Sequence, residues 1–138
     1  MQDTGKTAML EGGCLCGAVR YEVEDAFLYA MHCHCSQCRR ATGAAFKTFG
    51  GIGAESLRLL PGSGPLMRYG DAEAHDLHCS ACGSLLWSSL SGGTRLHVTY
   101  GTLAATPAMA PQCHIFTGSG AGWYRILDDL PQYDGFPT

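Results

Sequence analysis

Apolar and polar residues alternate in short runs along most of the chain. Val19, Tyr21 and Val23 alternate with polar residues, as in a strand with one buried face. Similar runs return roughly every ten residues, with turn residues between them. By this pattern, further strands are expected at residues 27–31, 46–49, 57–60, 66–69, 76–79, 84–89, 94–100 and 112–117. Short, evenly spaced strands are typical of an all-β domain built from small packed antiparallel sheets.

Three local features refine this prediction. Residues 36–42 can form a helical turn, and Gly43 would end it. The glycine-rich stretch at residues 50–53 predicts a turn. Residues 84–89 and 94–100 flank a Ser-Gly-Gly sequence, and we expect them to pair as a hairpin.

Length and charge narrow the possible functions. The 138 residues show no internal boundary, so we expect a flexible N-terminus over residues 1–11 and a single domain over residues 12–138. The net charge is −3, with the basic residues mostly scattered, which argues against a nucleic-acid partner. No apolar run is long enough to span a membrane, and no signal peptide is recognisable, so we expect a cytoplasmic protein.

Cysteines carry the strongest chemical signal in the chain. Seven of the eight fall into three tight clusters. In a reducing compartment such clusters are more often metal ligands than disulfides, although a disulfide framework remains an alternative. Cysteines two residues apart also make strained disulfide partners.

Two of the clusters together supply four thiolates. Cys14 and Cys16 precede Gly17, and Cys79 and Cys82 precede Gly83. A glycine there can adopt a positive φ and turn backbone N–H groups toward the sulfurs. We expect these four cysteines to hold one structural zinc ion that joins the N-terminal strand to the central hairpin. The alternative is that some of them are buried free thiols.

The third cluster supplies three thiolates, from Cys33, Cys35 and Cys38. Zinc with three protein ligands keeps a fourth position for water or substrate, and a thiol bound there loses its proton. A second structural site is the alternative. The residues that could close it are His32, His34, His114 and the unpaired Cys113.

The order of these clusters resembles the glutathione-dependent formaldehyde-activating enzyme family, which also contains centromere protein V. Three blocks carry the resemblance: residues 13–21, 33–46 and 79–84. The tail fits as well, at residues 114–116, 123–124 and 130–133. The resemblance implies packed antiparallel sheets around zinc, the β-tent fold of methionine sulfoxide reductase B. It also implies the same division into one structural and one labile, catalytic zinc ion.

The resemblance further implies a zinc-dependent carbon–sulfur lyase, related to S-hydroxymethylglutathione synthase. Cys33, Cys35 and Cys38 would carry the catalysis, with a small thiol such as glutathione as partner. Arg39 or Arg40 could pair with a carboxylate of that ligand. The alternative function is a non-catalytic glutathione-binding, thiol-binding or zinc-binding module. Methionine sulfoxide reduction is a minor option, with Cys113 as its nucleophile.

Overall fold

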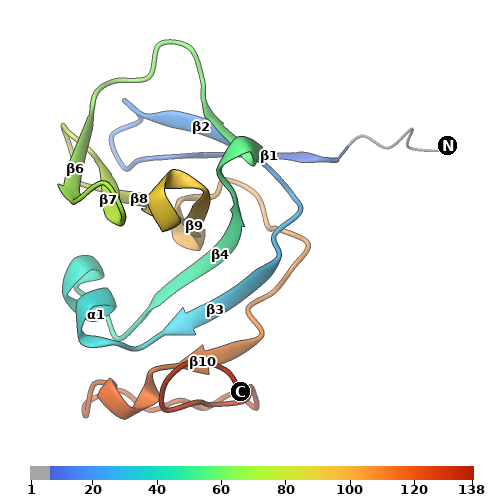
Figure 1. Cartoon of the computed structure of the whole chain (residues 1–138), viewed down its shortest axis with the longest axis vertical. Helices are drawn as coiled ribbons and strands as arrows, with labels where there is room; N and C mark the ends of the chain where they lie inside the picture. The colour runs from blue at the N-terminus through green and yellow to red at the C-terminus, as the bar shows by residue number, and fades with distance from the viewer. Residues whose placement is uncertain (1–6) are drawn as a thin grey trace, which may run out of the picture.

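Two β-sheets form the framework of the protein (Figure 1). The computed structural model describes residues 7–138. The smaller sheet has the strand order β1-β2-β5, and the larger has the order β10-β3-β4-β9-β8-β7-β6. The three strands of the smaller sheet are β1 (Met9–Gly13), β2 (Arg20–Glu24) and β5 (Leu57–Leu59). The seven strands of the larger sheet are β3 (Tyr29–Cys33), β4 (Lys47–Gly53), β6 (Leu66–Gly70), β7 (His75–Cys79), β8 (Leu85–Leu90), β9 (Arg95–Thr99) and β10 (Cys113–Ile115).

The predicted all-β class is confirmed. Strands β8 and β9 pair antiparallel, as expected for the hairpin. All neighbouring strands pair antiparallel except β10, which runs parallel to β3. The helical turn is also present as α1 (Ser36–Thr42), which ends at Gly43 with φ 65°.

The turn predicted at residues 50–53 is wrong, because β4 continues through Gly53. A side chain at Gly50 would lie 2.6 Å from the rings of Phe27 and Tyr100, and one at Gly51 would overlap the Tyr29 ring. The glycines therefore let aromatic side chains cross the strand. They mark a close approach in the middle of a sheet, which a sequence pattern does not distinguish from a turn.

The expected N-terminal segment over residues 1–11 lies partly outside the described residues. Its last three residues belong to β1, where Met9 pairs with Glu24 and Leu10 with Val23. Leu10 is buried in the core. The ordered sheet thus begins at Met9.

The main core lies between the two sheets and includes Tyr21, Leu86 and Val98, which are fully buried. The opposite face of the larger sheet carries a different set of side chains. Because side chains alternate along a strand, Cys33 on β3 and Lys47 on β4 lie on that face beside each other as a registered pair. In Figure 1, α1 follows directly from the end of β3, so it lies at the edge of this face.

Candidate metal centres

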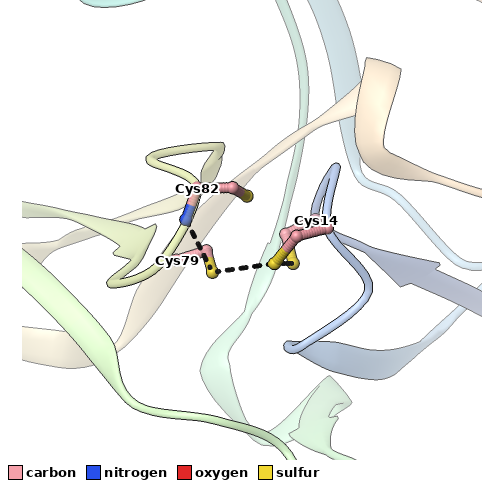
Figure 2. A group of neighbouring side chains, drawn as sticks. Cys14, Cys79 and Cys82 are labelled. Atoms are coloured by element: carbon pink, nitrogen blue, oxygen red, sulfur yellow. Dashed lines mark hydrogen bonds between the residues drawn. The ribbon is translucent and has the colours of Figure 1, made fainter.

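The four cysteines predicted to form one site come together where the two sheets meet. They are Cys14, Cys16, Cys79 and Cys82. Figure 2 shows Cys14 facing Cys79 and Cys82 across the gap between two loops. The Sγ atoms of all four lie within 4.8 Å of one another. The first two follow β1, and the other two lie at the end of β7 and in the turn before β8, so this four-cysteine cluster links the two sheets.

The sulfur spacing of this cluster fits a metal ion. The Sγ of Cys16 lies 3.7 Å from that of Cys14 and 3.8 Å from that of Cys79. A disulfide would require about 2.05 Å, and all the cysteines are free thiols. Four sulfurs placed tetrahedrally at ~2.3 Å from zinc would be about 3.8 Å apart. The donor set and its spacing therefore suit zinc or a similar thiolate-binding ion.

Backbone N–H groups turn toward these sulfurs, as the two glycines suggested. The N–H of Val19 donates to Cys14 over 3.2 Å, and that of Cys82 donates to Cys79 over 3.4 Å. Gly17 and Gly83 both have φ 83°, which makes these tight loops possible. Donors of this kind spread the negative charge of thiolates and prepare the loops for a cation.

Ser84 supports the same cluster. Its hydroxyl lies 3.2 Å from the sulfur of Cys82 and accepts the N–H of Leu15 over 2.9 Å, which joins the two cysteine loops. Hydrogen bonds from the Ser84 hydroxyl and N–H lower the pKa of Cys82 to about 5. Sequence spacing gave no sign of this serine.

The second cluster, the three-cysteine cluster, is formed by Cys33, Cys35 and Cys38, whose Sγ atoms also lie within 4.8 Å of one another. Cys33 ends β3, Cys35 caps α1, and Cys38 lies in the first turn of the helix. The N–H of Cys38 donates to the sulfur of Cys35 over 3.3 Å. The strand end and the helix start therefore fix three sulfurs around one point.

The pKa values of Cys33 and Cys38 shift in opposite directions. A hydrogen bond from the Cys38 thiol lowers the pKa of Cys33 to about 6, assisted by the N–H of Cys35 and the charge of Lys47. The same hydrogen bond, together with burial, raises the pKa of Cys38. A site that favours a thiolate at neutral pH is prepared for a cation.

No fourth ligand of the expected kind reaches the three-cysteine cluster in the part of the chain that the structure describes. The ring of His32 bonds Thr48 through Nδ1, at 2.7 Å. His34 and His114 bond each other over 2.8 Å, and Asp128 accepts from His114 over 3.0 Å. These side chains are held in partnerships of their own, away from the sulfurs.

Cys113 does not complete the three-cysteine cluster either, although it belongs to the same buried cluster of side chains as Cys33. It lies on β10, opposite Met31 of β3, and is buried in a small apolar cluster. Burial raises the pKa of its thiol, so Cys113 has the character of a core residue. The geometry around residues 33–38 leaves one side free for a further ligand.

A cavity of about 590 Å³ lies on this free side. Cys33, Cys38 and Lys47 all line it, as do Ser88 of β8 and Asp76 of β7. Its size falls within the range of small-molecule sites. The remaining walls are mostly apolar, with Met31, Phe49 and Ile115 among them.

Lys47 is the residue of this cavity that sequence reasoning missed. Its side chain is buried, and its Nζ donates to the hydroxyl of Ser88 over 2.9 Å. Ser88 in turn donates to Asp76 over 2.6 Å. Burial lowers the pKa of Lys47, while the negative charges of Cys38 and Asp76 oppose that shift. The only sequence signal was a lysine at a core-facing position of a predicted strand.

The predicted anion-binding arginines lie elsewhere. The guanidinium of Arg39 donates to the carbonyl of Ser119 over 3.2 Å, and Arg40 is exposed. Helix α1 contributes Gln37, Cys38 and Ala41 to the cavity, and neither arginine lines it. A role for Arg39 or Arg40 in ligand binding stays a prediction.

The fold and the two clusters define a class, an all-β protein with two cysteine sites able to hold metal ions. The sequence matches the model of the glutathione-dependent formaldehyde-activating enzyme family over residues 9–119. Because this match covers most of the chain, the protein belongs to that family.

Two further proteins are similar to this chain. A Halomonas elongata protein named for the same family is 33% identical over 87 residues, which cover 57% of this chain and 55% of that protein. The chain therefore matches about half the length of this curated relative. A crystal structure of a Rhodobacter sphaeroides protein superposes with a TM-score of 0.57 at 29% identity, covering 73% of this chain and 97% of the other.

Among the helices of residues 7–138, none has the length and hydrophobicity of a membrane span.

Proposed function

We propose that this protein is a zinc-dependent enzyme of the carbon–sulfur lyase type that acts on the adduct of a thiol, such as glutathione, with a small aldehyde. This is the S-hydroxymethylglutathione synthase type of reaction, for which the family is named. The observation that carries the proposal is the three-cysteine cluster, which has a free side that faces a cavity containing Lys47.

The proposal assigns two zinc ions to the chain. Cys14, Cys16, Cys79 and Cys82 would hold the structural ion, and the three-cysteine cluster would hold the labile one. Bound there, zinc would supply Lewis acidity that keeps a substrate thiol ionised at neutral pH. Residues 12–138 would act as one zinc-binding domain in the cytoplasm, where the thiols stay reduced.

Lys47, held in place by Ser88, would act on the aldehyde. The substrate sulfur attacks the carbonyl carbon, a C–S bond forms, and the carbonyl π electrons move to oxygen. Lys47 Nζ is positioned to donate a hydrogen bond to that oxygen, as in an oxyanion hole. The proton that the thiol releases ends on this oxygen, so thiol plus aldehyde gives the hydroxymethyl thioether, and the reverse gives the lyase reaction.

The cavity walls would contribute in a second way. Their apolar side chains exclude water, which strengthens the interaction between Lys47 and a developing negative charge. Because Lys47 and Cys33 are paired residues on adjacent strands, the donor and the sulfur site are held by one rigid sheet. Such positioning reduces the entropic cost of bringing thiol and aldehyde together.

The test is the rate of adduct formation from formaldehyde and glutathione, measured against the uncatalysed background. We expect acceleration by the zinc-loaded protein, loss of it in Cys35→Ser, and retention of it in Cys113→Ala, which removes a thiol outside both clusters. Circular dichroism checks that each variant folds. Absence of acceleration, with release of one zinc ion on addition of glutathione, would contradict the proposal and support a non-catalytic thiol-binding module.

A further inference from the structure

The cavity beside the three-cysteine cluster has an uneven chemical character. Its walls come largely from apolar side chains, among them Met31, Phe49, Leu85, Leu90, Ile115 and Phe116. Its charged side chains form one stripe across the sheet, from Lys47 through the hydroxyl of Ser88 to Asp76. A ligand that fills this space therefore meets mainly carbon atoms.

The positive charge of Lys47 is balanced by its neighbours, although its ammonium group keeps N–H donors beyond the one that Ser88 accepts. The charge of Lys47 is flanked by the thiolates on one side and Asp76 on the other. His97, which also lines the cavity, adds no positive charge at neutral pH, because burial lowers its pKa to about 4. Arg39 and Arg40 lie outside the lining.

With one dication bound, the three-cysteine cluster and its cavity would carry a net negative charge, which disfavours an anionic ligand. Three thiolates with one dication leave one negative charge, and Lys47 and Asp76 cancel each other. A thiol that binds in ionised form adds a second negative charge. If Lys47 were neutral, the total would be more negative still. In surroundings of low dielectric constant, carboxylates on such a ligand are repelled more strongly than in water.

We infer that this cavity takes an uncharged, largely apolar thiol in preference to glutathione. The inference rests on the proposed function, because it assumes that a thiol binds on the free side of the three-cysteine cluster. Glutathione brings two carboxylates and one ammonium group. In the cavity lining, the charge of Lys47 is balanced by Asp76, and His75 bonds the carbonyl of Asp71, so neither carboxylate meets an excess of positive charge. An aryl or alkyl thiol would instead bury its carbon atoms against Phe49 and Leu90.

Cobalt-substituted protein tests this inference without measuring activity. A thiol that joins the three-cysteine cluster changes the thiolate-to-cobalt absorption, and titration gives its dissociation constant. The probes are phenylmethanethiol, glutathione and glutathione dimethyl ester. We expect phenylmethanethiol to bind at least about tenfold more tightly than glutathione, and the ester, which lacks the carboxylates, to bind more tightly than its parent.

Asp76→Asn is the matched variant, because asparagine can still accept the hydrogen bond from Ser88. Removing this negative charge should favour both thiolates, but it should improve glutathione binding more, so that the ratio between the two dissociation constants changes by roughly threefold or more. Thermal unfolding checks that the variant folds. A ratio between the two thiols that does not change in this variant would remove the electrostatic basis of the inference and overturn it.

The outcomes separate the two proposals. If glutathione binds as tightly as phenylmethanethiol or more tightly, a thiol site exists but its substrate class is not the one inferred. If none of the thiols changes the absorption, the proposed function fails as well, because the thiol then has no place at the cluster.

Discussion

The two cysteine clusters use the same ligand type but differ in what surrounds them. The four-cysteine cluster joins two sheets, is complete in number, and is surrounded by N–H donors and the hydroxyl of Ser84. The three-cysteine cluster lies at the end of one strand, lacks a fourth ligand among residues 7–138, and faces a cavity with a buried lysine. A closed set of ligands suits stability, and an incomplete set beside a cavity suits chemistry.

The two clusters also differ in how far apart their cysteines lie in the sequence. The four-cysteine cluster connects residues more than sixty positions apart, so a cation there closes a long loop and restricts the unfolded chain. The three-cysteine cluster spans six consecutive residues, 33–38. A cation bound there orders little beyond the start of α1. We therefore expect folding to depend on the first cluster and activity on the second.

The largest expected effect is on stability, in Cys16→Ser. Cys16 is exposed, so its replacement tests metal binding and not core packing. We expect the zinc-loaded variant to lose at least about 4 kcal/mol of unfolding free energy or to fail to fold. Urea unfolding with metal analysis measures the change.

The matched variant is Cys35→Ser in the three-cysteine cluster, for which we expect a loss of less than about 2 kcal/mol, because serine can still cap α1. Equal losses in the two variants would mean that the clusters do not differ in structural role.

The next effect concerns catalysis by Lys47. Replacement by methionine keeps the volume and removes the donor, so we expect kcat to fall by about 10²-fold, with zinc content and KM nearly unchanged. Arg58→Met, on the exposed face of β5 in the other sheet, serves as the control for loss of a positive charge. A kcat for Lys47→Met within the range of that control would exclude Lys47 from the reaction.

A smaller effect is the pH dependence of alkylation at Cys33 after the labile ion alone has been removed. The pKa of Cys33 is lowered to about 6, chiefly by the hydrogen bond from Cys38. Its thiolate therefore persists at pH 7 and is lost as the pH falls through 6, so iodoacetamide labelling should drop about tenfold between pH 7 and pH 5. Cys113, whose pKa burial raises, should react far more slowly. A labelling midpoint for Cys33 above pH 8 would disagree with this geometry.

The smallest effect is expected for Ser84→Ala. This change removes the hydroxyl that contacts Cys82 and accepts from the N–H of Leu15, and we expect a loss of about 1 kcal/mol. Ser80→Ala, in the exposed part of the same turn, should change stability by less than about 0.5 kcal/mol. Denaturant midpoints of the two variants, compared directly, measure the difference.

Much of the fold could be predicted because it follows from local patterns. Val19, Tyr21 and Val23 alternate, and the structure buries all three in β2 or just before it. Gly43 ends α1 because a left-handed residue is needed there. The same kind of pattern gave a wrong turn at Gly50 and Gly51. Glycine is required there because aromatic rings from other elements cross the strand. Contacts between distant segments leave no local signature.

The candidate sites could also be predicted only where their residues are close in sequence. Cysteine spacing was enough to separate four sulfurs from three, because ligands of one metal are often close in sequence. The stripe of Lys47, Ser88 and Asp76 was not predictable, since its members come from three strands and meet only through sheet register. The prediction of Arg39 and Arg40 as ligand-binding residues rests on their charge and nearness in sequence, and neither lines the cavity.

The most direct test of the account is the rate at which each bound zinc ion is lost to a chelator, followed by metal analysis per chain and by unfolding temperature. We expect two ions per chain. One ion should leave quickly with little change in unfolding temperature, and alkylation of Cys33, Cys35 and Cys38 should release this ion. The second should leave only as the protein unfolds. Release of both ions at one rate, or a single ion per chain, would contradict the division between a structural and a working site.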